Sequence, residues 1–276
     1  MMIGWQRQKK LKVKIRFILL IIIILSIGFI LCSKFNSKDN IRKALKIGVT
    51  DGIPQVIMSK VAKEYGEDNI ELESIEMYTF QDCWGNSTQL ALSSDAIDLA
   101  IICSSKANEF VKSDNRFEIV SPVIQNSNLV VMKNEKIKKI GVSEGRSYEK
   151  DIAKKMFKET FEIVELPSKS LPYAMEKGDV GGIVIDYLKS LEVIGERKII
   201  DIGEDYNTFS IIIKKEIKDK EEFKRFISAY DSTIDFLQKE DNFLQSISEN
   251  RKKDYVNERR RKEWKMLNMK MLKLKE

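Results

Sequence analysis

KIGVTDG at residues 46–52 returns in close variation as KIGVSEG at residues 139–145. Each copy opens with an apolar run typical of a buried strand and ends in a hydroxyl residue, an acid and a glycine. A second pair of segments, AIDLAII at 96–102 and DVGGIVI at 179–185, follows the two copies in the same order. The sequence therefore predicts two similar α/β units in tandem. The alternative is chance similarity, because ordinary βα units are built from a small set of similar sequence patterns.

The repeat predicts an architecture and the place of a ligand site. We expect an α/β fold of two lobes, each a mostly parallel sheet flanked by helices, and such sheets bind ligands in the crevice at the carboxyl ends of their strands. An apolar run at 209–213 predicts a strand that returns through a second hinge, and a helical pattern covers 221–244. Lobe 1 is therefore predicted to comprise residues 44–123 plus 206–250, and lobe 2 residues 124–205.

Composition excludes several classes of function. The net charge of +6 comes from basic clusters in residues 1–16 and 251–276, so it is no argument for nucleic-acid binding. The chain has no histidine, which removes the Ser-His and Cys-His catalytic pairs and the commonest transition-metal ligand. We therefore predict no catalytic residues, no cofactor, no metal site and no nucleic-acid partner.

Residues 1–33 have the layout of a secretory signal, a basic stretch followed by an apolar run at 17–31. The run is short for a membrane span, which needs about 20 residues. Two fates stay open: lipid attachment at Cys32, as in a bacterial lipoprotein, or an uncleaved anchor of the same topology. Leu31 stands where a lipobox would place Gly, Ala or Ser. Either fate leaves the basic end inside and places residues 34–43 outside as a polar tether.

Five motifs, taken in order, carry a resemblance to a known family: SSDAIDLAII (93–102), SPVIQNSNLVV (121–131), IGVSEGRSYEKDIAKK (140–155), MEKGDVGGIVIDY (175–187) and YNTFSIIIKKE (206–216). Over residues 45–245 the sequence resembles the substrate-binding proteins of bacterial ABC importers, which have the type II periplasmic-binding fold. The branch it resembles serves nitrate, sulfonate and pyrimidine-precursor uptake. DCWG at 82–85 resembles a narrower group, the substrate-binding (seleno)proteins encoded beside an organomercurial-lyase-like protein, in which cysteine or selenocysteine occupies a comparable place.

The resemblance implies a non-catalytic, extracytoplasmic protein that captures a small solute by lobe closure. It would deliver the solute to an ABC permease and its ATPase subunit. Two other functions stay open. A thiaminase-like enzyme on the same fold would pair Cys83 with Asp186 or Glu144, although activation of a thiol normally needs an adjacent base or cation. A membrane-tethered sensor lobe would need a separate signalling partner.

Cys83 and Cys103 are the most distinctive candidates for ligand contact. Both follow predicted strands of lobe 1 at the edge that faces the crevice, and Asp186 is the counterpart of Cys103 in lobe 2. A thiol near a helix N-terminus is biased toward the thiolate, and two thiols at one rim could hold a soft metal or a thiophilic organometal. Three interpretations of the pair stay open: a ligand or redox role, a structural disulfide, and inert burial.

Polar residues at the turns complete the predicted site. Hydroxyl and N–H groups at βα turns gather around anions, and Arg146 suits a bidentate clamp. Helix capping is the alternative for Thr50 and Ser143, and core packing is the alternative to solute stacking for Trp84. Asn126 lies at the crossover between the lobes. The predicted ligand-binding residues are Thr50, Asp51, Cys83, Trp84, Cys103, Asn126, Ser143, Arg146, Asp186 and Tyr187.

Residues 251–276 predict a basic C-terminal helix. Trp264, Leu267, Met271 and Leu274 recur at helical spacing beside a run of arginines. Such a helix either docks on a membrane surface or a partner, or packs against lobe 1 with its basic face in solvent.

Overall fold

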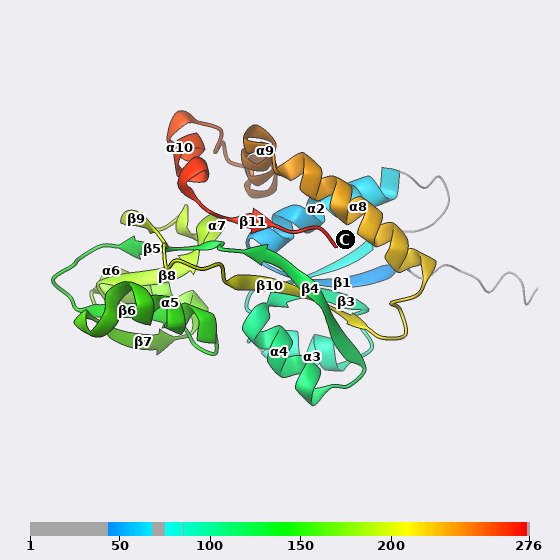
Figure 1. Cartoon of the computed structure of the whole chain (residues 1–276), viewed down its shortest axis with the longest axis horizontal. Coiled ribbons are helices and arrows are strands. Elements are labelled where there is room, and N and C mark those ends of the chain that lie inside the picture. Colours follow the sequence, from blue (N-terminus) through cyan, green and yellow to red (C-terminus); the bar gives the residue numbers. More distant parts are fainter. Residues whose placement is uncertain (1–43, 68–74, 85, 275–276) are drawn as a thin grey trace, which may run out of the picture. The chain divides into compact units, whose positions relative to one another are not determined.

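The computed structural model describes residues 44–67, 75–84 and 86–274, which form two β-sheets flanked by helices (Figure 1). The predicted signal or anchor segment, Cys32 and the tether lie outside the described residues. Within the described part, no helix has both the length and the apolar character that crossing a membrane requires. We refer to the first sheet with its helices as lobe 1 and to the second as lobe 2. The α/β fold with two sheets is confirmed, and the residue boundaries of the lobes stay a prediction.

The first sheet has the strand order β11-β4-β10-β3-β1-β2 among the described residues. Its strands are β1 (Leu45–Thr50), β2 (Ile75–Phe80), β3 (Leu99–Cys103), β4 (Phe117–Gln125), β10 (Asn207–Lys214) and β11 (Lys270–Met271). β1 pairs in parallel with β2 and β3, whereas β10 runs antiparallel to β3 and β4. β3 is buried along its whole length, as expected of a strand covered on both faces.

The second sheet has the strand order β7-β6-β8-β5-β9. Its strands are β5 (Asn128–Met132), β6 (Lys139–Ser143), β7 (Glu162–Leu166), β8 (Gly182–Asp186) and β9 (Glu196–Ile199). β6 pairs in parallel with β7 and β8, whereas β5 runs antiparallel to β8 and β9.

The repeated segments occupy equivalent places in the two sheets. β1 and β6 each lie at the centre of a parallel triplet, with β3 and β8 as their equivalent neighbours. Parallel pairing is confined to these triplets, so each sheet is mixed rather than mostly parallel. The reason is the path of the chain: β5 and β10 enter their sheets directly from the other lobe, and they therefore run against strands whose carboxyl ends face the crevice.

Helices cover both faces of the first sheet. Figure 1 shows α2 and α8 on one face and α3 and α4 on the other. The helices of the described chain are α2 (Ile53–Glu67), α3 (Asn86–Ser93), α4 (Ser104–Ser113), α5 (Ser147–Phe157), α6 (Leu171–Lys177), α7 (Tyr187–Ser190), α8 (Glu221–Leu237), α9 (Glu240–Arg251) and α10 (Glu258–Met266), with short 3₁₀ turns at Lys158–Thr160 and Ser168–Ser170. The single helix expected over 221–244 is thus two helices, and α9 folds back to contact α2 as well as α8.

Asn126 joins the two chain crossings between the lobes. It has a φ of 58°, a left-handed conformation that asparagine tolerates better than most residues. Its side-chain amide donates to Oδ1 of Asp205 at 2.7 Å and to the carbonyl oxygen of Asn268 at 2.9 Å. Its Oδ1 accepts from the backbone N–H of Tyr206 at 3.0 Å. The first crossing, the second crossing and the C-terminal segment therefore meet at one side chain.

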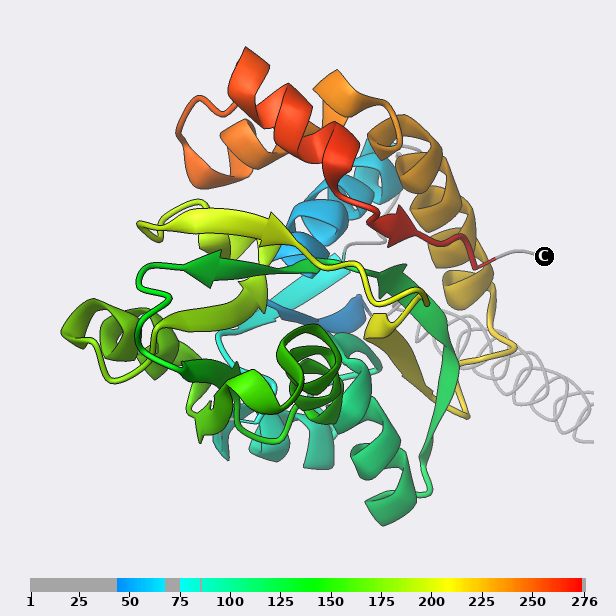
Figure 2. The same ribbon diagram turned by 60° about the vertical axis from the view of Figure 1, so that its left-hand side comes forward.

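The C-terminal segment is only partly helical, which corrects the prediction of one helix over residues 251–276. α10 ends at Met266, and β11 then pairs with the edge strand β4 (Figure 2). We call residues 267–274 the C-terminal strap. The N–H of Leu272 donates to the carbonyl oxygen of Val123 at 2.9 Å, and the ring of Trp264 stacks on Phe243 of α9 at a centroid distance of 4.3 Å. The apolar residues of the tail thus pack on the protein itself.

Candidate site between the two lobes

Each of the two repeated turns approaches a residue of the other lobe across the crevice. Gly52 and Gly145 have φ values of 118° and 77°, which glycine adopts without steric cost. A Cβ at Gly52 would lie 3.2 Å from Oδ1 of Asp186, and a Cβ at Gly145 would lie 2.6 Å from Cε2 of Trp84. A side chain at Gly145 would therefore clash with the Trp84 ring, and one at Gly52 would fit only tightly against Asp186.

Cys83 lies fully buried beside the ends of β1 and β3. Oγ1 of Thr50 is 3.0 Å from its Sγ and 3.1 Å from the carbonyl oxygen of Ile101. The backbone N–H of Cys103 donates to Sγ of Cys83 at 3.2 Å. The parallel pairing of β1 with β3 brings Thr50 and Cys103 to the same edge of the sheet, as the sequence predicts.

These surroundings favour a thiolate at Cys83. Burial raises the pKa of Cys83, but hydrogen bonding from the Cys103 thiol, the charge of Arg146 and hydrogen bonding from Thr50 outweigh burial and lower the pKa to about 6. Burial, followed by the hydrogen bond to Cys83 and its charge, raises the pKa of Cys103 well above its ordinary value. At neutral pH the pair therefore holds a negative charge on Cys83 and a proton on Cys103.

A buried ion pair faces Cys83 from lobe 2. Nη1 of Arg146 donates to Oε1 of Glu149 at 2.9 Å, and the two side chains are 3% and 0% exposed. Glu149 also accepts from the side-chain amide of Asn128 at 3.2 Å and from the backbone N–H of Ser143 at 2.7 Å. One nitrogen of the predicted Arg146 clamp is thus already bonded to Glu149 within lobe 2. Sequence reasoning missed Glu149, although its place three residues after Arg146 in a predicted helix was an available signal.

Several polar atoms around this pair are buried without a hydrogen-bond partner among the described residues. They are Nε1 of Trp84, Oδ1 of Asn128, Nε of Arg146 and the hydroxyl of Tyr148. Buried polar groups in native proteins are nearly always hydrogen-bonded, so each unpaired one needs an explanation. Here they come from both lobes and include donors and an acceptor, which is the complement that a small polar solute requires.

Lys106 adds a second buried cation. Its side chain is 3% exposed and pairs with Glu109 at 3.1 Å. Its Nζ also lies 4.5 Å from the centre of the Trp84 ring, a distance typical of cation–π attraction. Trp84 therefore contacts Lys106 of its own lobe and Gly145 of the other lobe. No sequence pattern pointed to Lys106, because a lysine early in a helix is usually solvated.

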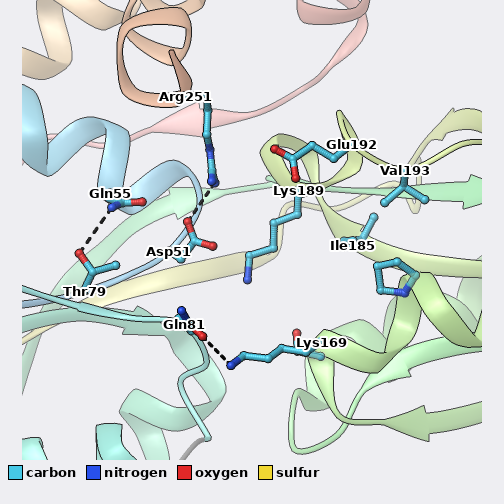
Figure 3. A pocket seen from close by; sticks show the side chains of 12 residues that line it. Asp51, Gln55, Thr79, Gln81, Lys169, Ile185, Lys189, Glu192, Val193 and Arg251 are labelled. Carbon is cyan, nitrogen blue, oxygen red and sulfur yellow. Dashed lines mark hydrogen bonds and ion pairs between the residues drawn. The ribbon is translucent and has the colours of Figure 1, made fainter. Parts of the chain in front are cut away.

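A cavity of about 620 Å³ opens beside this cluster (Figure 3). Lobe 1 contributes the turn after β1, the end of β2 and the end of α9, and lobe 2 contributes α6, β8 and α7. In Figure 3, the side chains of Lys169 and Lys189 extend from lobe 2 toward Asp51 and Gln81 of lobe 1. The lining residues are Asp51, Gln55, Thr79, Gln81, Ser168, Lys169, Pro172, Ile185, Lys189, Glu192, Val193 and Arg251.

The cavity and the buried cluster share their walls. Ser168 lines the cavity, and its hydroxyl is 3.0 Å from the hydroxyl of Ser143, whose N–H binds Glu149. Asp51 lines the cavity next to Thr50, and it pairs with Arg251 at 2.9 Å. The cavity is large enough for a small ligand, since such sites span about 300–1,000 Å³.

The structure also places the remaining predicted residues. Asp186 caps α7 by accepting from the N–H of Leu188 at 3.0 Å, and it faces Gly52. Asn126 lies at the hinge, away from the cluster, and lines a separate cavity of about 210 Å³ with Asn268. Tyr187 is buried, and its hydroxyl has no hydrogen-bond partner among the described residues.

Two alternatives drawn from the sequence are resolved by these contacts. Neither Thr50 nor Ser143 caps the helix that follows it, because their hydroxyls face Cys83 and Ser168 instead. Cys83 and Cys103 are both free thiols, so they form no disulfide in this structure. Among the described residues no cluster of three or more acidic, cysteine or histidine side chains is arranged to hold a metal ion.

No family model matches the sequence, and no curated protein matches it either. Solved structures do share the fold. The ligand-binding component of an ABC-type import system from Staphylococcus aureus, with zinc bound, superposes with a TM-score of 0.68 at 13% identity, over 84% of this chain and 86% of that one. A nutrient-binding protein from Burkholderia cenocepacia, bound to methionine, gives 0.56 at 18% identity, over 71% and 96%. A pheromone cOB1 precursor and lipoprotein of the YaeC family from Enterococcus faecalis gives 0.57 at 15% identity, over 71% and 96%.

The chain therefore has the two-lobed fold of periplasmic-binding proteins. At these identities the likeness concerns the fold alone, so the function has to be argued from the site.

Proposed function

We propose that this protein is the extracytoplasmic solute-binding component of an ABC importer. It captures a small solute between lobe 1 and lobe 2 and delivers it to a membrane permease and its ATPase. The observation that carries the proposal is the set of unpaired buried polar atoms contributed by both lobes, Nε1 of Trp84 on one side and Nε of Arg146 and Oδ1 of Asn128 on the other. A solute held there would contact both lobes and so favour the closed form.

Several findings support the importer role. The structural relatives include a ligand-binding component of an import system and a lipoprotein. The basic and apolar segments of residues 1–33 suit an export signal whose Cys32 is lipidated or whose apolar run stays as an anchor. The narrower proposals, the nitrate, sulfonate and pyrimidine-precursor branch and the (seleno)protein group, rest on the sequence motifs alone.

The test removes one unpaired donor while keeping its ring. In Trp84→Phe the indole Nε1–H is lost, and an apolar ring still faces Gly145 and Lys106. The matched control is Trp264→Phe, because Trp264 stacks on Phe243 outside the crevice. Small molecules retained by the full-length protein are identified by mass spectrometry, and their affinities are then measured by calorimetry.

We expect Trp84→Phe to weaken binding at least tenfold, or about 1.4 kcal/mol, and Trp264→Phe to bind as wild type does. Equal affinities for all three proteins would remove the site from between the lobes. A retained molecule that is chemically converted on incubation would replace the importer proposal with an enzyme.

One observation favours a cysteine-dependent enzyme as the second candidate. The low pKa of Cys83 gives a thiolate without histidine, with Arg146 as the neighbouring cation, and thiolates of this kind act as nucleophiles. Trapping decides the question. A covalent adduct on Cys83 that forms from a retained molecule and turns over with time would support catalysis, whereas stoichiometric, unmodified binding would not.

A further inference from the structure

Cys83 and Cys103 lie next to each other in lobe 1. Both are fully buried and free, and the N–H of Cys103 lies 3.2 Å from Sγ of Cys83. The backbone of Cys103 is therefore in direct contact with the Cys83 sulfur, at one edge of the same sheet.

The two thiols have different surroundings. The sulfur of Cys83 accepts from the backbone N–H of Cys103, lies 3.0 Å from the Thr50 hydroxyl, and is under the positive charge of Arg146. Cys103 ends the buried strand β3 and precedes the first turn of α4. The charge of Arg146 also lowers the pKa of Cys103, but burial and the neighbouring Cys83 outweigh it. Cys83, whose thiolate is favoured, is suited to attack an external disulfide. Cys103, which keeps its proton, is suited to resolve the mixed disulfide that follows.

We propose that Cys83 and Cys103 are a reversible dithiol–disulfide pair in which Cys83 exchanges first with an external low-molecular-weight disulfide. The pair is a modification site within lobe 1, and it goes beyond the solute-binding function. Access depends on the lobes, because Cys83 is fully buried and the ring of its neighbour Trp84 packs against Gly145 of the other lobe. In this proposal the external disulfide reaches the sulfur when the lobes open.

The exchange balances in two steps. The Cys83 thiolate attacks one sulfur of the external disulfide, forms a mixed disulfide and releases the first small thiolate. Cys103 then loses its proton to solvent and attacks Sγ of Cys83, which breaks the mixed disulfide and releases the second thiolate. Counted from the Cys83 thiolate and the Cys103 thiol, the protein loses two electrons and one proton, and the external disulfide leaves as two thiolates, which take up protons according to the pH.

The consequence concerns the charge in the crevice. Oxidation removes the negative charge that faces Arg146 and ends the contact of the Cys83 sulfur with the Thr50 hydroxyl. Arg146 then keeps Glu149 as its acidic partner. The oxidised and reduced proteins therefore present different charge to any molecule held between the lobes.

The test uses the full-length chain in detergent with Cys32→Ser, which leaves two thiols. The probe is 4,4′-dithiodipyridine, whose released thiopyridone is followed by absorbance, and intact mass identifies the product. In the reduced native protein we expect release of two thiopyridones per chain and a product lighter by two hydrogen atoms with no adduct. Adding Cys103→Ser should stop the reaction at one thiopyridone and one adduct. Adding Cys83→Ser should slow the first release about tenfold or more, because the remaining thiol carries little thiolate.

The proposal is overturned if the native two-thiol protein ends with an adduct on either cysteine. It is equally overturned if it releases no thiopyridone, or if Cys83→Ser reacts as fast as the two-thiol protein. Circular dichroism of both single variants checks that the fold is kept. The outcome is independent of solute binding, which is measured separately on the Trp84→Phe variant.

Discussion

At the scale of single residues, the crevice holds a buried carboxyl group whose ionisation opposes folding. Burial raises the pKa of Asp186 from 3.8 to about 6, against the nearby positive charges of Lys189 and Arg146. The folded state therefore holds a proton that the unfolded state has lost between about pH 4 and pH 6. Stability falls as the pH rises through this window, because the native state binds more protons there.

The variant Asp186→Asn tests this relation. Asparagine keeps the Oδ1 acceptor that caps α7 at Leu188 but carries no charge, so the variant should not lose stability across the window. Wild type should lose on the order of 2–3 kcal/mol relative to the variant between pH 4 and pH 6. Urea unfolding at several pH values measures the difference, with the exposed Asp179→Asn as the control for loss of one charge. Parallel pH curves for wild type and Asp186→Asn would contradict the prediction.

The residue scale also shows how far the sequence determined the site. The places of Thr50, Cys83, Trp84, Arg146 and Asp186 were predictable because each ends or follows a strand of a parallel triplet, and parallel strands bring such ends to one edge. Glu149 could have been found from its place three residues after Arg146 in a predicted helix. The burial of Lys106 was not predictable, because it depends on the ring of Trp84, which lies far from Lys106 in the sequence.

At the scale of elements, the turn at Gly145 controls contact between the lobes. Gly145→Ala should hinder closure, because a Cβ would lie 2.6 Å from the Trp84 ring. Gly203→Ala is the matched control: it has almost the same φ, 76°, with nothing within 4 Å of the added Cβ. Both variants should lose about 1 kcal/mol of stability from backbone strain.

Only Gly145→Ala should enlarge the radius of gyration measured by X-ray scattering, since only that alanine meets the other lobe. Equal radii for Gly145→Ala and Gly203→Ala would show that the turn does not limit closure.

The hinge at Asn126 depends on two properties of that residue, its left-handed backbone conformation and its side-chain hydrogen bonds. Two variants separate their contributions to stability. Asn126→Gly keeps the positive φ and loses the hydrogen bonds to Asp205, Tyr206 and Asn268. Asn126→Ala loses the same bonds and adds left-handed strain. Both should lower the free energy of unfolding, and the alanine variant by about 1 kcal/mol more than the glycine variant. Urea denaturation measures both values, and a more stable alanine variant would refute this account of the hinge.

Elements were predictable where hydrophobic patterns are local. β3, β6 and β8 are apolar runs, and α6 has the bounds that its pattern indicates. β9 was missed because Glu196–Ile199 has a single apolar residue and so shows no alternation of apolar and polar side chains. Among the described strands it pairs with β5 alone, at the edge of the sheet. β11 was missed because two residues become a strand only through the edge of β4. The break between α8 and α9 was missed because both helices continue the same apolar stripe.

At the scale of the whole molecule, we predict that the two lobes lie outside the cell membrane. Residues 1–31 should export the chain, because a basic stretch stays inside while the residues after the apolar run cross the membrane. Alkaline phosphatase fused after residue 40 should be active in a bacterial host, and the same fusion without residues 1–31 should be inactive. Equal activity of the two fusions would remove the importer proposal.

The mode of membrane attachment is tested separately at Cys32. If Cys32 is the lipidated residue, labelled palmitate should be incorporated into wild type and lost in Cys32→Ser, while the exported location is kept. Incorporation that persists in Cys32→Ser would place the lipid elsewhere, and no incorporation in either protein would leave the uncleaved anchor.

The C-terminal strap has a consequence for the order in which the protein assembles. All strands of the second sheet lie between Asn128 and Ile199, so that sheet is complete once this stretch has been synthesised. The first sheet begins earlier, at Leu45, but it lacks β10 until Lys214 and β11 until Met271. Chains fold in the direction of synthesis as their domains become complete. The lobe that begins first is therefore finished last, and the hinge is fastened only when the final residues of the chain reach β4.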